Sequence, residues 1–191
     1  MQSKRNSEFM PLFPVGTEIP SLYAKPQWFV GCVRYCHEHK AADMLSHLNV
    51  EHYLPVQIVR RRWSDRMKNV EVLLIPRYIF IRCKYSERVE ILENVPDITH
   101  FLVDRDTHKS ATVREESMNI FRRMVEYDDR EITVEPGLFA PGDHVRVIHG
   151  PLAGSECDLV EVNGRKCIAV NLGILGAARM EMPLSQIELI K

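Results

Sequence analysis

The stretch PGDHVRVIHGPLAG, residues 141–154, decides how the C-terminal part of this sequence folds. Its second half contains a glycine-rich turn that could hold a phosphate, but the Gly-Lys-Ser/Thr ending of a phosphate loop is missing. Val145 and Val147 alternate with polar residues, as in a strand that buries one face. Gly150 and Gly154 then allow the chain to turn. We therefore interpret the stretch as the start of a small β-barrel.

Short strand patterns continue from this stretch to the end of the sequence. They are HVRVI, DLVEV, KCIAVNL, RMEM and QIELI, and turn residues separate them. Asn163-Gly164 is typical of a tight hairpin, because both turn positions must accept positive φ. This spacing predicts an all-β barrel over residues 141–191.

The region before residue 127 mixes strand and helix patterns. WFVGCVR (28–34) is apolar on both alternating sets, which indicates a central strand. An amphipathic helix is predicted from Ala41 to Leu48, and another after a capping box formed by Thr112 and Glu115. Further strands are predicted over 53–63, 70–75, 78–83 and 98–103, with a turn at 64–69. The region is therefore predicted to be α+β.

These patterns divide the chain into segments of different charge. We expect a flexible arm (1–26), an α+β domain (27–127), a linker (128–140) and the barrel (141–191). Residues 1–125 hold 19 Lys+Arg against 15 Asp+Glu, whereas residues 126–191 hold 6 against 11. The net charges are +4 and −5, so the two halves are expected to have different partners.

The composition is that of a folded globular protein, with 45% apolar and 27% charged residues. The longest apolar runs, at 72–75 and 78–81, are far too short to span a bilayer, and prolines interrupt the N-terminus, so we expect a cytoplasmic protein. Five cysteines without paired spacing argue for a reducing compartment. The group Cys32, Cys36, His37 and His39 fits zinc spacing poorly, and we predict no metal or cofactor.

Three motifs in this order resemble the NusG family of transcription elongation factors. They are the opening Trp28-Phe29-Val30, the segment PRYIFI (76–81), and the KOW motif GDHVRVIHGPLAG (142–154). The resemblance covers nearly everything from Trp28 to Lys191. The specialised RfaH-like and UpxY-like antiterminators look most similar, because ITHFL (98–102) is similar to a segment of RfaH. Arg77 stands where general NusG proteins usually have glycine.

The resemblance implies a non-enzymatic protein with an antiparallel sheet flanked by helices and an SH3-like KOW barrel. The first domain would bind the clamp helices of RNA polymerase. The protein would act as a monomer and suppress pausing or termination. Ile75 and Phe80 match the apolar anchor for polymerase. The residues alone favour core positions for both, since strand residues surround them. The operon controlled would be a specific one, such as a capsular polysaccharide locus.

The densest basic patch is Arg60, Arg61 and Arg62 with Trp63 beside them. A hairpin tip of this kind could lie along DNA phosphates or stack on a base, or it could be a solvated loop. The resemblance adds Arg34 and Lys40, which match positions that face the non-template DNA strand in RfaH. Met44 and Asp97 stand in the region of other base-reading residues of RfaH, so any sequence preference must differ.

The acidic barrel is a poor candidate for phosphate binding and a better one for a protein partner. The resemblance implies that the loop with Ile174 and Leu175 contacts ribosomal protein uS10 or the termination factor Rho. A core-facing role for this pair is the alternative. Cys157 replaces the glycine that usually follows the KOW turn and would be strained if that position needs positive φ. A ribosome-associated KOW protein that binds RNA is the alternative function.

Overall fold

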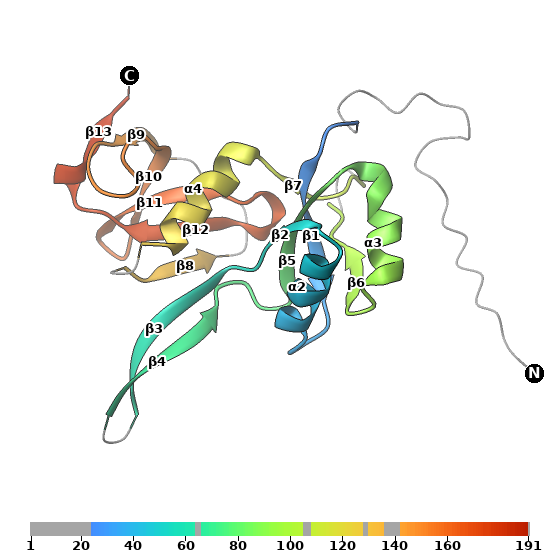
Figure 1. Cartoon of the computed structure of the whole chain (residues 1–191). Coiled ribbons are helices and arrows are strands. Elements are labelled where there is room, and N and C mark those ends of the chain that lie inside the picture. Colours follow the sequence, from blue (N-terminus) through green and yellow to red (C-terminus); the bar gives the residue numbers. More distant parts are fainter. Residues whose placement is uncertain (1–23, 64–65, 105–107, 128–129, 136–141, 191) are drawn as a thin grey trace, which may run out of the picture.

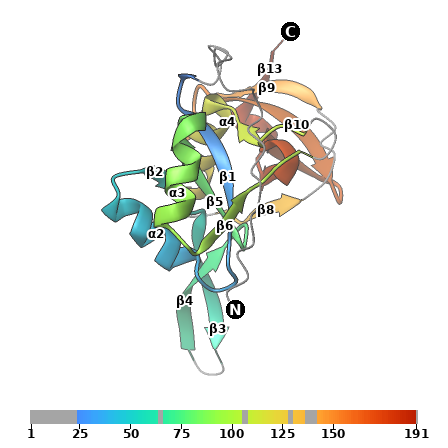
Figure 2. The ribbon, with the colours of Figure 1, turned by 90° about the vertical axis from the view of Figure 1, so that its right-hand side faces the viewer.

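The computed structural model describes residues 24–63, 66–104, 108–127, 130–135 and 142–190. The predicted N-terminal arm, up to residue 23, therefore lies outside the described residues. The rest forms an N-terminal α+β part and a C-terminal β part, with a two-stranded hairpin that projects away from both (Figures 1 and 2). No helix in the described ranges is long and apolar enough to cross a membrane.

The N-terminal part is built on an antiparallel sheet with the strand order β2-β5-β1-β6, in which β7 also pairs with β1. Its strands are β1 (Gln27–Val33), β2 (Glu51–Tyr53), β5 (Tyr78–Cys83), β6 (Ile98–Phe101) and β7 (Thr112–Val113). As predicted, β1 is a central strand, buried on both faces. This confirms the α+β fold class.

Two helices, α2 (Glu38–His47) and α3 (Arg88–Asn94), pack on one face of this sheet. Ala41 and Leu45 of α2 and Ile91 of α3 join the strand residues in one buried cluster. The sequence predicted α2 from its apolar spacing, but α3 was missed. Its seven residues are too few to show a helical period clearly.

The third helix, α4 (Glu115–Val125), buries the predicted stripe of Met118, Phe121 and Met124. The predicted capping box is wrong, because Arg114 occupies the N-cap position and no side chain caps the helix. Thr112 lies in β7, where it pairs with Phe29 of β1. Its backbone is therefore committed to the sheet before the helix begins.

The hairpin consists of β3 (Val56–Trp63) and β4 (Arg66–Leu73), which form a separate two-stranded sheet. The predicted strand 53–63 is interrupted between β2 and β3, where Pro55 cannot donate a backbone hydrogen bond. The predicted turn at 64–69 is shorter than expected, because β4 already begins at Arg66. The hairpin is consequently longer and more exposed than the sequence indicated.

The C-terminal part is a six-stranded antiparallel sheet with the order β13-β9-β10-β11-β12-β8. Its strands are β8 (Ile132–Glu135), β9 (Asp143–Val147), β10 (Glu156–Val162), β11 (Arg165–Asn171), β12 (Ala177–Glu181) and β13 (Ile187–Leu189). Val145 and Val147 are fully buried, as their alternation predicted. Strand β8 lies within the range that the sequence assigned to a linker.

The turns of the C-terminal part follow the sequence predictions. Asn163 and Gly164 both have positive φ, 51° and 76°, between β10 and β11. Gly150 and Gly154 have φ of 85° and 82°, and the Gly154 amide donates to the Val147 carbonyl at 2.8 Å. The glycine-rich stretch is therefore a chain turn. Cys157 is buried in β10 and is not among the residues with positive φ, so it carries no such strain.

One continuous apolar core joins the two parts. It runs from Trp28 and Phe80 of the first sheet through Phe121 of α4 to Val145 and Met180 of the barrel. Both views show α4 between the two sheets (Figures 1 and 2). The barrel is therefore packed against the N-terminal part, with α4 as the central contact.

Candidate functional site

An apolar groove of about 450 Å³ lies where the two parts meet. The N-terminal part contributes Leu74, Ile75, Pro76, Tyr78, Leu102 and Val103, and the C-terminal part contributes Val134, Ile174 and Leu175. The sequence assigned Ile75 to one partner and Ile174 with Leu175 to another. The structure brings these residues to a single groove.

Ile75 and Phe80, the two predicted anchor residues, occupy different environments. Ile75 is 7% exposed and lines the groove. Phe80 is fully buried, with its ring 6.5 Å from Tyr53 and 6.0 Å from Phe121 between centroids. Because α4 covers Phe80, only Ile75 of the pair reaches a surface in this arrangement.

The barrel loop that faces Ile75 is the short helical turn η2 (Gly173–Leu175). Ile174 is 43% exposed, as expected of a residue that contacts a partner. Leu175 is 7% exposed, as expected of a residue that faces the core. Gly173 has φ of 67°, and a Cβ placed on it would approach the Thr112 carbonyl oxygen of β7 to 3.2 Å. Glycine thus allows this loop to approach the N-terminal part closely.

Arg34 and Lys40 both contact the buried residue Asp97 near the end of β1. The Arg34 amide donates to the Asp97 carbonyl at 2.9 Å, and Lys40 Nζ lies 2.9 Å from Asp97 Oδ2. Asp97 is 2% exposed, whereas both cations are exposed. Lys40 lowers the pKa of the Asp97 carboxyl, and the positive charges of His37 and Arg34 add to this effect. Asp97 therefore holds Lys40 in place.

The hairpin separates the arginines that the sequence placed together. The register pairs Arg60 with Asn69, Arg61 with Lys68 and Arg62 with Met67. Since side chains alternate across a ribbon, Arg60 and Arg62 share one face, and Arg61 lies on the other with Lys68. All three arginines are exposed. The side chain of Trp63 lies outside the described residues.

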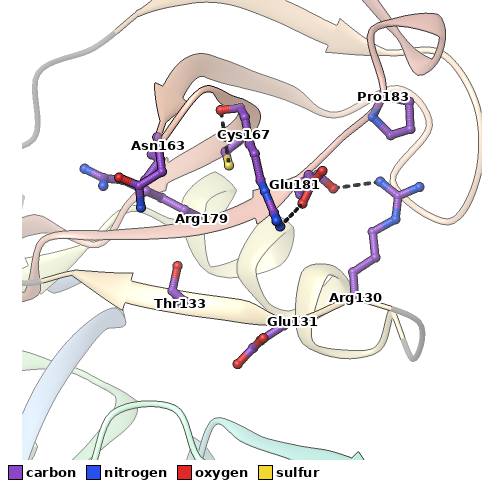
Figure 3. Close-up of a pocket in the computed structure, with 10 residues that line it drawn as sticks. Arg130, Glu131, Thr133, Asn163, Cys167, Arg179, Glu181 and Pro183 are labelled. Carbon is purple, nitrogen blue, oxygen red and sulfur yellow. Dashed lines mark hydrogen bonds and ion pairs between the residues drawn. The ribbon is translucent and has the colours of Figure 1, made fainter.

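A second cavity, of about 610 Å³, opens on the outer face of the barrel (Figure 3). Arg130 donates to the Glu181 carbonyl at 2.7 Å and to Gln186 Oε1 at 3.1 Å. Arg165 pairs with the Glu181 carboxylate at 3.1 Å, and Arg179 pairs with Glu135. These three arginines are therefore already engaged, which makes the cavity a poor anion site.

The sequence did not predict that Tyr78, Leu102 and Val134 line the groove, nor that Arg77 lies at the end of the sheet near Arg34 and Lys40. Tyr78 could have been found, because the period of a strand places it on the same face as Phe80. Leu102 and Val134 gave no signal, since their role depends on contacts between distant segments. Arg77 was noted only for replacing a glycine.

The described residues thus form an α+β sheet domain followed by a small barrel with a KOW-type turn. A family model described as "Transcription termination factor nusG" matches residues 26–122. The chain belongs to the NusG family, whose members are transcription factors and not enzymes. This confirms the family resemblance and the predicted absence of an enzymatic role.

Curated relatives agree with this assignment. The transcription termination/antitermination protein NusG of Lactococcus lactis is 28% identical over 139 residues, which cover 71% of this chain and 72% of the relative. That of Rickettsia felis is 30% identical over 128 residues, covering 64% and 65%. A solved structure described as "Domain interaction in Thermotoga maritima NusG" is 18% identical in sequence, with a TM-score of 0.43. The match covers 88% of this chain and 99% of the chain in that structure. A structure of the MjSpt4:Spt5 complex covers 86% and 98% at 11% identity, with a TM-score of 0.30.

Proposed function

We propose that this NusG-family protein is a specialised antitermination factor of the RfaH-like and UpxY-like kind, which travels with RNA polymerase. The groove at Ile75 is the observation that carries the proposal. It offers aliphatic and aromatic side chains that a helical partner would remove from water on binding. The clamp helices of RNA polymerase are the proposed occupant. A specific operon, such as a capsular polysaccharide locus, is the proposed target.

The basic surfaces are proposed to hold the non-template DNA strand while polymerase occupies the groove. Arg34 and Lys40 form one surface, and Arg60, Arg61 and Arg62 on the hairpin form the other, with Trp63 assigned from the sequence alone. Both surfaces belong to the N-terminal part, where the sequence carries its positive charge. Cationic side chains bind phosphates regardless of base sequence.

The barrel is proposed to recruit a second protein, uS10 or Rho, through Ile174 and Leu175. Because Leu175 and Ile75 line the same groove, the barrel and polymerase compete for this surface. Binding of polymerase would then release the barrel loop for its own partner. A ligand shifts such an equilibrium by its different affinity for the two states.

Retention of purified RNA polymerase on immobilised full-length protein tests the groove. Leu74 is half-buried and lines the groove, so Leu74→Glu should weaken retention by about 30-fold, the effect of losing about 2 kcal/mol at an interface anchor. Ile174→Glu should leave retention unchanged or raise it, because it weakens the competing barrel contact. Leu189→Glu, at a 64% exposed position on β13, is the matched control.

Full retention by Leu74→Glu, with the circular dichroism of the folded protein intact, would rule out this groove as the polymerase site. Sedimentation of the wild-type protein with ribosomes but not polymerase, in a high-salt lysate, would favour the ribosomal alternative instead. Phe80→Asp is unsuitable as a test, because it places a charge in the buried aromatic cluster.

A further inference from the structure

Arg77 has a backbone conformation that is unfavourable for an arginine. Its φ is 70°, in the left-handed region where only glycine avoids a penalty from the Cβ atom. Two hydrogen bonds hold it there: the Arg77 amide donates to Glu38 Oε1 at 3.0 Å, and the Arg77 carbonyl accepts from the Val33 amide at 2.8 Å. Glu38 is 3% exposed. A buried carboxylate is thus used to fix the backbone of an exposed cation, and strain of this kind points to a functional side chain.

The position of Arg77 in the topology links the two basic surfaces. Cys32 of β1 pairs with Tyr78 of β5, so the end of β1 lies beside the start of β5. Arg77 directly precedes β5, and Arg34 directly follows β1. The hairpin leaves the same end of the sheet, where the Leu74 amide donates to the Pro55 carbonyl at 3.0 Å. Both views show the hairpin projecting on the side where β1 runs into α2 (Figures 1 and 2).

The charge of Arg77 is available for a ligand. Within the described ranges, ion pairs engage Lys40, Arg82, Lys84 and Arg122 of the N-terminal part, but neither Arg34 nor Arg77. Burial raises the pKa of the Cys32 thiol, and the positive charge of Arg77 partly offsets that rise. The backbone of Arg77 lies beside Val33, the residue that precedes Arg34, because the Val33 amide donates to the Arg77 carbonyl.

We infer that Arg77 joins the Arg34 and Lys40 surface to the hairpin arginines, so that they form one continuous track for the phosphate backbone of a single nucleic-acid strand. Arg60 lies five residues beyond Pro55 along β3, or roughly 17 Å at about 3.3 Å per residue. That span corresponds to about five stacked nucleotides at about 3.4 Å each. This inference rests on the proposed nucleic-acid role of the two outer surfaces and adds the residue that connects them.

The test is the salt dependence of binding between the full-length protein and a labelled single-stranded DNA oligonucleotide, measured by fluorescence anisotropy. Arg77→Gly should weaken binding and reduce the slope of log K against log salt by about 0.7, the value for one phosphate contact on a single strand. The same variant should raise the melting temperature, because glycine relieves the backbone strain. Arg77→Lys should keep the slope. Arg165→Gly, at an exposed and ion-paired arginine of the barrel, should leave it unchanged.

An unchanged slope in Arg77→Gly, with the melting temperature raised, would overturn the role of Arg77. If the slope is unchanged but polymerase retention falls, Arg77 belongs to the rim of the apolar groove and contacts protein. If Arg34→Ala and Arg60→Ala also leave the slope unchanged, the proposed nucleic-acid role of the two outer surfaces is wrong as well. A reduced slope in those two variants, without one in Arg77→Gly, would leave two separate surfaces and no track.

Discussion

At the scale of single residues, the five cysteines differ sharply in accessibility. Cys36 is exposed, and the other four are buried. Burial raises the pKa of the Cys83 and Cys157 thiols to about 12, so both stay protonated at neutral pH. Since the thiolate is the reactive form, these thiols should not react in the folded protein.

We therefore expect a thiol reagent such as iodoacetamide to modify Cys36 alone at neutral pH. Mass spectrometry of the labelled protein gives the number and position of the modified thiols. Cys36→Ser should remove all labelling of the folded protein, and urea should expose the remaining cysteines. Rapid labelling of Cys157 in the native state would contradict the burial described for β10.

Phe80 offers a second test at this scale, because its sequence neighbours favour a core position whereas the family resemblance assigns it to a polymerase anchor. Its ring is fully buried against Tyr53 and Phe121. Phe80→Ala should lower the free energy of unfolding by about 3–5 kcal/mol, as a large cavity in a core does. Urea denaturation measures this change. A loss below about 1 kcal/mol would mean that the site collapses or that α4 does not cover Phe80.

The Lys40–Asp97 pair predicts a dependence of stability on pH. Lys40 lowers the pKa of Asp97 below the value of about 3.9 expected in the unfolded chain. The ionised Asp97 therefore stabilises the folded state above a pH of about 3.9, and this contribution is lost as the pH falls through the lower pKa of Asp97 in the folded protein. Asp97→Asn should reduce stability at neutral pH, and its difference from the wild type should shrink in acid. Asp143→Asn, at an exposed carboxylate, is the control for general charge effects.

At the scale of elements, Gln57 connects the base of the hairpin to β8. Its Nε2 donates to the Arg130 carbonyl at 2.6 Å, and the Ile132 amide donates to its Oε1 at 3.4 Å. Gln57 is 7% exposed, so both contacts are shielded from water. The Gln57 side-chain amide thus makes the two hydrogen bonds, one donated and one accepted, that the backbone of an adjacent strand would make to the start of β8.

Gln57→Leu should lower the free energy of unfolding by about 1–3 kcal/mol, because it leaves the buried Ile132 amide without an acceptor. It should also speed trypsin cleavage after Arg130, whose carbonyl Gln57 holds. Urea unfolding and timed digestion followed by mass spectrometry measure the two effects. Val59→Leu, at a half-buried apolar position of the same hairpin, should change neither appreciably. Unchanged cleavage in Gln57→Leu would show that the barrel alone fixes Arg130.

At the scale of the whole molecule, the shared core predicts a single cooperative unfolding transition. Trp28 lies in the shared core and Trp63 in the hairpin, so tryptophan fluorescence reports on the core and the hairpin, whereas far-ultraviolet circular dichroism reports on the secondary structure of both parts. The two melting curves of the wild type should coincide. Leu175→Ser, in the groove, should separate them, and the exposed Leu189→Ser should not. Separate transitions in the wild type would mean that the barrel is only loosely attached.

The sequence by itself determined the fold class, most strands and two of the three principal helices. It also determined the turns at Asn163-Gly164 and Gly150 to Gly154. These features depend on local rules: the period of apolar residues and the positive φ that glycine or asparagine tolerates. The failure at Thr112 has the same origin, since a capping pattern is local but the pairing of Thr112 with β1 is not.

Only the tertiary structure decided which predicted residues share a site. It placed Ile75 and Leu175 in one groove and covered Phe80 with α4. It also split Arg60 from Arg61 by the register of the hairpin, and it joined the backbone of Arg77 to that of Val33, the residue before Arg34. Each outcome depends on contacts between segments that are far apart in the chain. Packing between such segments follows from the summed burial of many side chains, and no short stretch of sequence contains that information.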